Sequence, residues 1–323
     1  MRYCWLALAP LLFAWTLNAG GQETSAPARL PEGDAGIAAK YPGDAGIEKD
    51  PAVVFVERFE DDLSRWDTRY GDPHITHDPE NVRSGKGALE LMMDWSKKTD
   101  GVSSNRGLIR YFQPGFDLFH FRYYTKLGKD TELYNGHNGP SVAATAPGVP
   151  SEGAAGIPAN GYDKFTARLD IWRPAQAPSP GYLTFYSYYP EQNSRWGDHI
   201  FPSGKINPGQ RSPESVFGKG FVPRPDVVPE RGRWFCCEIM LKTNTPGQRD
   251  GRMAFWVDGK LAGDFPNFRM REVESLKVNL INVGLYIPLG RSQNPCMEWH
   301  DDIVAATSYI GPMVEEKKGS ARP

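Results

Sequence analysis

The sequence predicts an all-β protein built as a sandwich of two antiparallel sheets. Strand-length segments alternate between apolar and polar residues. In "KFTARLDIWR", at 164–173, Phe165, Ala167, Leu169 and Ile171 fall on one side, as expected for a strand with one dry face. The 34 glycines and 28 prolines suit many strands joined by turns. No stretch of useful length has the periodicity of an amphipathic helix, so the pattern favours a β-sandwich.

Strand signals recur from "AVVFVERFE" onward, with turn residues between them. The Asp-Gly of "VDGK" at 257–260 indicates a hairpin, and "TNTPGQRDG" is typical of a longer loop between two strands. We expect strands near 53–59, 87–93, 107–112, 118–127, 164–173, 181–189, 233–243, 252–257, 260–264, 278–286 and 297–307.

The bulk composition argues against two classes of protein. The 323 residues carry a formal net charge of -2, whereas a nucleic-acid partner would call for a basic patch or stripe. A hydrophobic fraction of 40% with 12% aromatic residues can build a sizeable core and is too high for a disordered chain. Because sandwiches of about 200–250 residues routinely form one domain, we expect a single domain at 53–311.

The N-terminal segment predicts export. "MRYCWLALAPLLFAWTLNAGGQ" has an early arginine, a short apolar run and small residues at its end, the layout of a signal peptide rather than a stable membrane span. We therefore expect a signal peptide at 1–21 and a secreted or periplasmic protein. An acidic, Gly/Pro-rich leader at 22–52 would follow, and 312–323 would form a charged C-terminal tail. The leader contains GDAGI at 33–37 and again at 43–47, and we expect it to be solvated and packed along the domain surface.

Export would leave three cysteines, Cys236, Cys237 and Cys296, so at least one thiol stays free. Neighbouring strand residues point to opposite faces, which places Cys237 on the apolar side as a buried thiol. A Cys236–Cys296 bridge is left open.

Two long segments interrupt the strand pattern, at roughly 129–163 and 190–231. Loops of this length in a compact domain are usually functional or disordered. Both carry aromatic residues, histidine and asparagine, which favours ordered loops that form a site.

Three of the expected strands share an unusual polar side made of cations and aromatic rings. If these strands pair, they form a broad surface on which rings stack against pyranoses and cations meet carboxylates, as an acidic polysaccharide would require. A plain solvated face, with Arg168–Asp170 as a surface ion pair, is the alternative. The residues concerned are His120, Arg122, Tyr124 and Lys126 on 118–127, Arg168, Asp170 and Trp172 on 164–173, and Tyr186 and Tyr188 on 181–189.

The segments "GRWFCCEIMLKTNTPGQRDGRMAFWVDGKLAGDF" and "MEWHDDIVAATSYIGP" resemble the second half of the concanavalin A-like jelly rolls found among polysaccharide lyases. The group meant contains the alginate- and glucuronan-lyase-like enzymes. "YDKFTARLDIWR" and "YLTFYSYYPEQ" resemble their central concave strands. Over roughly 53–311 the resemblance implies a β-jelly roll and, less specifically, cleavage of uronate-containing glycans by β-elimination.

β-Elimination from a uronate needs a group that neutralises the C5 carboxylate, a base for the C5 proton and an acid for the leaving oxygen. Arg168 or Arg122 is a candidate for the first role, and His137 or Tyr188 for base or acid. Further candidates are Lys126, Asn135 and His199. A glycosidase would want two carboxylates facing one cleft, and Asp170 is the only acid on the three expected strands, so hydrolysis ranks lower.

The same resemblance implies a structural Ca²⁺ that ties the first strand to the last. Glu57 in "FVERFE" and Asp301 in "EWHDDIV" match the two acidic positions, and backbone oxygens near Ser84 are further candidates. The alternative is that both acids simply pair with lysine or arginine.

Three classes of function remain open from the sequence: a polysaccharide lyase, a glycan-binding module without catalysis, and a structural surface protein. The polysaccharide and the oligomeric state are open as well.

Overall fold

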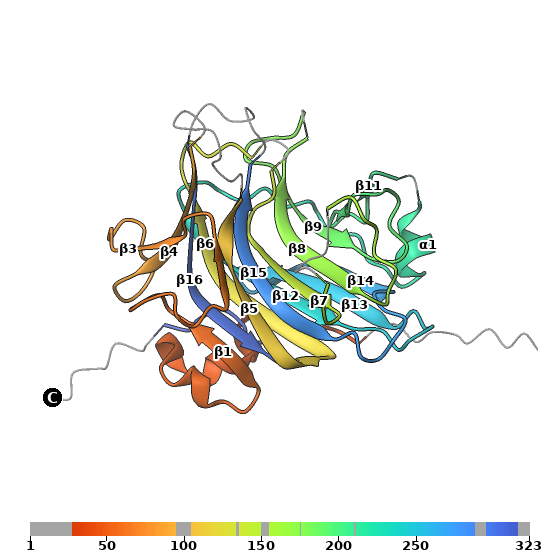
Figure 1. Cartoon of the computed structure of the whole chain (residues 1–323), viewed down its shortest axis with the longest axis horizontal. Helices are drawn as coiled ribbons and strands as arrows, with labels where there is room; N and C mark the ends of the chain where they lie inside the picture. The colour runs from red at the N-terminus through yellow and green to blue at the C-terminus, as the bar shows by residue number, and fades with distance from the viewer. Residues whose placement is uncertain are drawn as a thin grey trace, which may run out of the picture.

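The computed structural model describes residues 28–94, 105–133, 136–149, 155–174, 176–209, 211–287 and 295–315. Over these residues the chain forms two eight-stranded sheets, here sheet A and sheet B, stacked as an antiparallel sandwich (Figure 1). The all-β jelly-roll prediction is confirmed.

Sheet A has the order β14-β13-β12-β6-β16-β4-β3, and β1 also pairs with β16. Its strands are β1 (Val53–Glu57), β3 (His74–Thr76), β4 (Ala88–Met93), β6 (Leu118–Leu127), β12 (Trp234–Lys242), β13 (Gly251–Val257), β14 (Lys260–Phe268) and β16 (Cys296–Ala306).

Sheet B has the order β11-β10-β9-β8-β7-β15-β5-β2. Its strands are β2 (Thr68–Tyr70), β5 (Asn105–Phe116), β7 (Pro140–Thr145), β8 (Lys164–Trp172), β9 (Tyr182–Tyr188), β10 (Asp198–Ile200), β11 (Ile206–Asn207) and β15 (Val278–Tyr286). One short helix, α1 (Pro213–Phe217), belongs to the loop that follows β11.

Every strand expected from the sequence is present, and five more were not expected: β2, β3, β7, β10 and β11. β7 matters most, because it lies between β8 and β15 in the middle of sheet B. All six of its residues, Pro140–Thr145, are buried. A strand covered on both faces shows no alternation of apolar and polar residues. Residues 140–145 therefore lack the alternation that predicted the strand at 164–173, and β7 was not expected.

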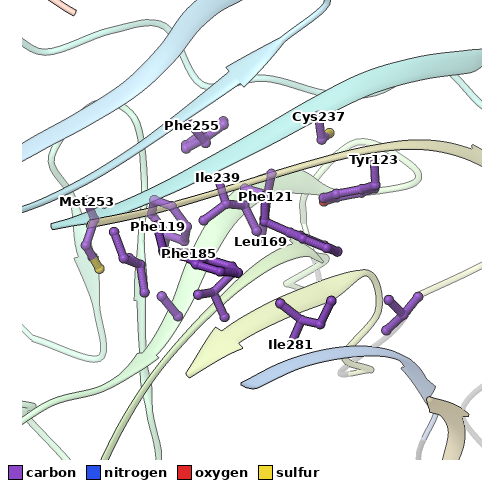
Figure 2. Close-up of a cluster of buried hydrophobic side chains, with 14 of the residues drawn as sticks. Phe119, Phe121, Tyr123, Leu169, Phe185, Cys237, Ile239, Met253, Phe255 and Ile281 are labelled. Atoms are coloured by element: carbon purple, nitrogen blue, oxygen red, sulfur yellow. The ribbon is translucent and has the colours of Figure 1, made fainter. Parts of the chain in front are cut away.

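The core lies between the sheets and contains the apolar side predicted for each alternating strand. Phe119 and Phe121 of β6 and Ile239 of β12 face Leu169 of β8, and all are buried (Figure 2). Phe185 of β9 meets Phe255 of β13 edge to face across the sandwich, with ring centroids 5.4 Å apart and ring planes at 86°. Burying each such side chain contributes about 1.5–3 kcal/mol, and this contact fixes how β9 lies over sheet A.

The segment before β1 packs on the outer face of sheet A, and Figure 1 shows its short helical turns beside β1. The turns are η1 (Gly33–Ala35), η2 (Ile37–Lys40), η3 (Pro42–Asp44) and η4 (Ile47–Lys49). The two GDAGI copies end in Ile37 and Ile47, which are both buried in one small cluster with Val304 and Ile310. The repeat therefore supplies the same apolar contact twice, and the leader is more deeply buried than a solvated segment would be.

The three described cysteines are buried and none of them forms a disulfide, so the Cys236–Cys296 bridge that the sequence left open is absent among them. Cys237 lies in the main core, as predicted, and Cys296 lies there too. Cys236 is on the opposite side of β12 from Cys237 because adjacent strand residues point to opposite faces. Cys236 and Cys296 therefore point away from each other.

The predicted pairing of 118–127 with the strands of the polar face is also wrong. β6 pairs with β12 and β16 in sheet A, whereas β8 and β9 pair with each other in sheet B. Alternation tells which side chains share a face of one strand, but it carries no information about the neighbouring strand. No helix in the described parts of the chain is long and apolar enough to cross a membrane.

Candidate functional site

A groove of about 840 Å³ crosses the outward face of sheet B. β8, β9 and β10 supply most of its floor, β15 supplies one wall, and the loop between β9 and β10 supplies part of the rim. Its lining includes Tyr70, His137, Ser141, Thr166, Arg168, Trp172, Tyr186, Tyr188, Trp196, His199 and Tyr286.

Strand pairing explains why these side chains meet. On β8 every second residue faces the groove, and in the register with β9, Thr166 lies opposite Tyr188 and Arg168 opposite Tyr186. His199 of β10 lies opposite Tyr186 on the far side. Side chains opposite each other on one face are neighbours, so three short strands bring together residues up to 33 positions apart.

The aromatic rings on the groove floor form a stack. His137 lies on Tyr186 with ring centroids 4.2 Å apart, and Trp172 lies on His199 at the same 4.2 Å. Tyr186 and His199 join the two pairs at 4.8 Å, and Tyr286 stacks on His137 at 5.9 Å. Stacked rings cover one another's faces, so the middle of the stack meets a ligand with ring edges and polar atoms.

His137 is oriented by a buried carboxylate. Its Nδ1 lies 2.7 Å from Oδ2 of Asp170, which is fully buried, while the His137 side chain remains 27% exposed. The other oxygen of Asp170 accepts the backbone N–H of Asn138 at 3.2 Å. An ionised Asp170 places the imidazole proton on Nδ1 and leaves Nε2 as the basic nitrogen.

The turn that carries His137 is held by both sheets. Asn138 accepts the Ile171 N–H of β8 through Oδ1 at 2.9 Å and donates through Nδ2 to Oε1 of Glu298 at 3.1 Å. Glu298 belongs to β16 of sheet A, and its Oε2 accepts the Gly139 N–H at 3.3 Å. Glu298 is buried, and its two hydrogen bonds attach this turn to sheet A.

Arg168 lies beside this turn with its guanidinium bonded along the groove wall. Nη1 donates to the Gly139 carbonyl at 2.5 Å and the Gly284 carbonyl at 3.4 Å, and Nη2 donates to Oγ of Ser141 at 3.4 Å. Only 9% of Arg168 is exposed. These bonds orient a permanent positive charge next to His137.

Two tyrosines complete the arrangement. The Tyr186 hydroxyl donates to the Tyr188 hydroxyl at 3.4 Å and accepts the Gly197 N–H at 3.2 Å. Burial, together with the hydrogen bond to Tyr188, raises the pKa of Tyr186, so its hydroxyl stays protonated at neutral pH and can act as a proton donor.

Lys164 was missed by the sequence analysis. It lies on the groove side of β8 by the same alternation, with Nζ 5.0 Å from the centroid of the Tyr188 ring. Burial lowers the pKa of Lys164. The sequence did contain a signal for it: Lys164 is the first residue of this strand and shares the side of Thr166 and Arg168. Tyr286 and Ser141 were missed for a different reason. Ser141 lies on β7, and β7 also joins β15, which carries Tyr286, to β8; the sequence did not predict β7.

His199 is buried, and this burial lowers its pKa to about 3. It is therefore neutral at physiological pH, and its Nδ1 lies 3.3 Å from Oγ1 of Thr184. His199 is placed to pack and to form neutral hydrogen bonds rather than to carry charge.

The sequence-predicted residues on β6 lie elsewhere, because β6 belongs to sheet A. Arg122 is fully buried and pairs with Asp44 of the leader, and His120 bonds Glu238 at 2.8 Å. The Tyr124 hydroxyl accepts the Met313 N–H at 2.8 Å on sheet A. Lys126 donates to the Glu80 carbonyl at 2.6 Å. The prediction that these four share a groove with Arg168 is wrong. Asn135 lies outside the described residues.

The residues predicted to bind calcium fit a Ca²⁺ site in some respects and not in others. Oε2 of Glu57 is buried without a hydrogen-bond partner, and burial raises the pKa of Glu57; a carboxylate oxygen with no other partner is a suitable ligand for a cation. Asp301, whose pKa is raised by burial and by Asp302, accepts the N–H groups of Arg83 and Ser84 at 3.1 and 3.2 Å. Across the described residues no three His, Cys, Asp or Glu side chains converge, so such a site would need backbone oxygens.

Several solved structures are similar to this chain. An alginate lyase of the PL-14 group from Aplysia kurodai has a TM-score of 0.55 at 14% identity and covers 78% of this chain and 98% of its own. A double variant of the alginate lyase Aly36B, in complex with an alginate tetrasaccharide, gives 0.52 at 14% identity, with 81% and 98% covered. The alginate lyase vAL-1 from a Chlorella virus gives 0.51 at 15% identity, with 75% and 93% covered.

No family model matches the chain, and no curated protein matches it either. The structural likeness confirms the concanavalin A-like jelly roll and the resemblance to the alginate- and glucuronan-lyase group. At 14–15% identity it shows the fold, and function has to be argued from the groove.

Proposed function

We propose that this protein is an exported polysaccharide lyase that cleaves a uronate-containing glycan by β-elimination in the groove of sheet B. The observation that carries the proposal is the Asp170–His137 pair, 2.7 Å apart, in one groove with Arg168 and Tyr188. A buried carboxylate that orients a partly exposed histidine supplies a positioned base. The fold shared with alginate lyases supports the same class of reaction.

In the proposed reaction, Arg168 faces the C5 carboxylate and lowers the cost of charge that develops there. Nε2 of His137 takes the C5 proton, and the electrons of the C5–H bond form the C4=C5 double bond. The C4–O bond breaks, and the leaving oxygen takes a proton from the hydroxyl of Tyr188, which Tyr186 supports through its own hydroxyl. The product is an unsaturated uronate and a new chain end.

The test is to incubate the protein with a panel of uronate polysaccharides and follow the absorbance of the unsaturated product. A positioned acid or base contributes about 10²–10⁴-fold to a rate, so His137→Gln is expected to lose at least that factor while still binding the polymer. His74→Gln is the matched control, because His74 is half-exposed and pairs with Glu90 on sheet A. Equal rates in wild type and His137→Gln would contradict the proposed base.

A glycan-binding module without catalysis is the second candidate. It is favoured by the same bonds that orient Arg168: the guanidinium is already engaged by the carbonyls of Gly139 and Gly284. A wild-type protein that is retarded in a gel containing the polymer, and that forms no unsaturated product from it, would assign this function instead.

A further inference from the structure

The exposed residue Trp196 stands out at the rim of the groove. It is 49% exposed and belongs to the groove lining, on the loop between β9 and β10. A single exposed aromatic residue is ordinary on a protein surface, but Trp196 is exposed on the lining of a groove, where its ring can meet a bound ligand. The rings in the middle of the stack on the groove floor cover one another's faces, so Trp196 offers a sugar an additional ring face at the rim.

Hydrogen bonds hold this loop in one shape. The Trp196 carbonyl accepts bonds from Nε2 of Gln192 at 2.8 Å and Oγ of Ser194 at 2.9 Å, and the Trp196 N–H donates to Oγ of Ser194 at 3.1 Å. The buried carboxylate of Asp198 accepts the Asn193 N–H at 3.0 and 3.1 Å. The backbone of Trp196 is therefore pre-organised, which lowers the entropy lost on binding.

A second loop closes against the first. The Ala159 N–H donates to Oε1 of Gln192 at 3.2 Å. Gly156 has a φ of +76° and lies close to both side chains, because a Cβ there would be 3.0 Å from Nη2 of Arg195 and 3.2 Å from Cη2 of Trp196. A side chain larger than that of glycine at position 156 would therefore push against the indole and the guanidinium.

Arg195 gives the site its charge preference. Its guanidinium carbon lies 5.0 Å from the centroid of the Trp196 ring, and Arg195 is exposed. Neighbouring arginines are used differently, since Arg249 and Arg269 pair with Glu191. Within the described residues Arg195 forms no ion pair with a carboxylate, and its charge is available to an anionic ligand.

We propose that Trp196 and Arg195 form a further glycan subsite, which takes a uronate unit of the same chain that the groove binds. The indole packs on the pyranose face and the guanidinium meets its carboxylate. The subsite adjoins the proposed reaction centre, because the next residue, Gly197, donates its N–H to the Tyr186 hydroxyl. This inference rests on the proposed function and adds that long acidic chains are preferred over short ones.

The experiment measures retardation in native gels that contain alginate, polygalacturonate or a neutral glucan. Trp196→Ala is expected to bind the preferred acidic polymer about tenfold more weakly, which corresponds to the roughly 1.4 kcal/mol of one stacking contact. Arg195→Gln is expected to weaken binding less and to reduce its dependence on salt. Tyr162→Ala is the control, because Tyr162 is 60% exposed and is not part of the groove lining.

The outcomes separate the subsite from the function on which it rests. If wild type binds an acidic polymer and Trp196→Ala binds it equally well, the subsite is wrong while the groove function stands. If wild type binds neither acidic polymer, the proposed function itself fails. If Arg195→Gln loses affinity for the neutral glucan as much as for the acidic polymers, the assignment of Arg195 to a carboxylate is overturned.

Discussion

The outer faces of the two sheets carry similar residues, but the face of sheet A is covered by other segments of the chain and the face of sheet B forms an open groove. Sheet A presents His120, Arg122 and Tyr124, and the leader and the segment after β16 cover them. Sheet B presents His137, Arg168 and Tyr186 to an open groove. On both faces an acid holds a base, as Asp44 holds Arg122 and Asp170 holds His137. The contrast shows that charged and aromatic residues on a strand face mark a site only where no other segment of the chain covers them.

The covered face is closed by specific polar contacts as well as apolar ones. Glu238 of β12 accepts the N–H groups of Ile310 and Gly311 at 2.9 and 2.8 Å, besides its bond to His120. Arg122 donates to the carbonyl of Asp302 at 3.0 Å in addition to its pair with Asp44. Every one of these groups is buried, so each bond satisfies a polar atom that water cannot reach.

The largest predicted difference between the two faces concerns activity. Asp170→Asn keeps the shape of the side chain and removes the charge that holds the His137 proton on Nδ1. We expect the rate of product formation to fall roughly 10²-fold or more, with a change in melting temperature of a few degrees at most. The measurement is kcat and KM on the preferred polymer: the proposed role of Asp170 places the loss in kcat. A loss confined to KM would mean that Asp170 serves binding alone.

The second prediction concerns stability and the covered face. Asp44→Asn removes the partner of the buried Arg122 and leaves its charge uncompensated, which costs about 3–5 kcal/mol. We expect a clear fall in the urea midpoint of unfolding, while kcat at low temperature stays near the wild-type value. Asp34→Asn is the matched control, because Asp34 holds the equivalent position in the first GDAGI copy and is exposed. Equal midpoints for both variants would contradict the closing role of Asp44.

The sequence predicted the sandwich because alternation and turn residues are local signals, and Phe165, Leu169 and Phe185 were correctly placed in the core. Three of its candidates, Arg168, His137 and Tyr188, lie in one groove, and the strands or loop that carry them were visible in the pattern. It failed where the answer depends on pairing between distant segments. β6 entered sheet A because of its partners β12 and β16, and the cover over Arg122 comes from a leader 78 residues earlier in the chain. Neither the pairing of β6 nor the cover over Arg122 can be predicted from a local sequence pattern.

Calcium provides a third prediction, at the edge where β1 meets β16. If Glu57 and Asp301 hold Ca²⁺ with nearby backbone oxygens, a ligand that binds the folded state alone stabilises it by about 2.7 kcal/mol at 100 times its Kd. Protein stripped of metal is then expected to melt at a lower temperature and to recover when excess calcium is added. Glu57→Gln should remove this response and leave groove binding intact at low temperature. A melting curve of the stripped protein that excess calcium leaves unchanged would rule the site out.

The smallest predicted effect separates His199 from the exposed histidines. Because burial lowers its pKa to about 3, His199 stays neutral in the folded protein while the same residue in the unfolded chain takes a proton below about pH 6.5. The unfolded state then binds more protons, so stability is lost as the pH falls through this range, by about 1.4 kcal/mol per pH unit. Between pH 6.5 and 5, wild type should lose about 2 kcal/mol more than His199→Gln, as measured by urea unfolding at each pH. Parallel curves for wild type and His199→Gln would show that His199 takes up its proton in the folded state, and that the floor of the groove is more polar than its stacked rings indicate.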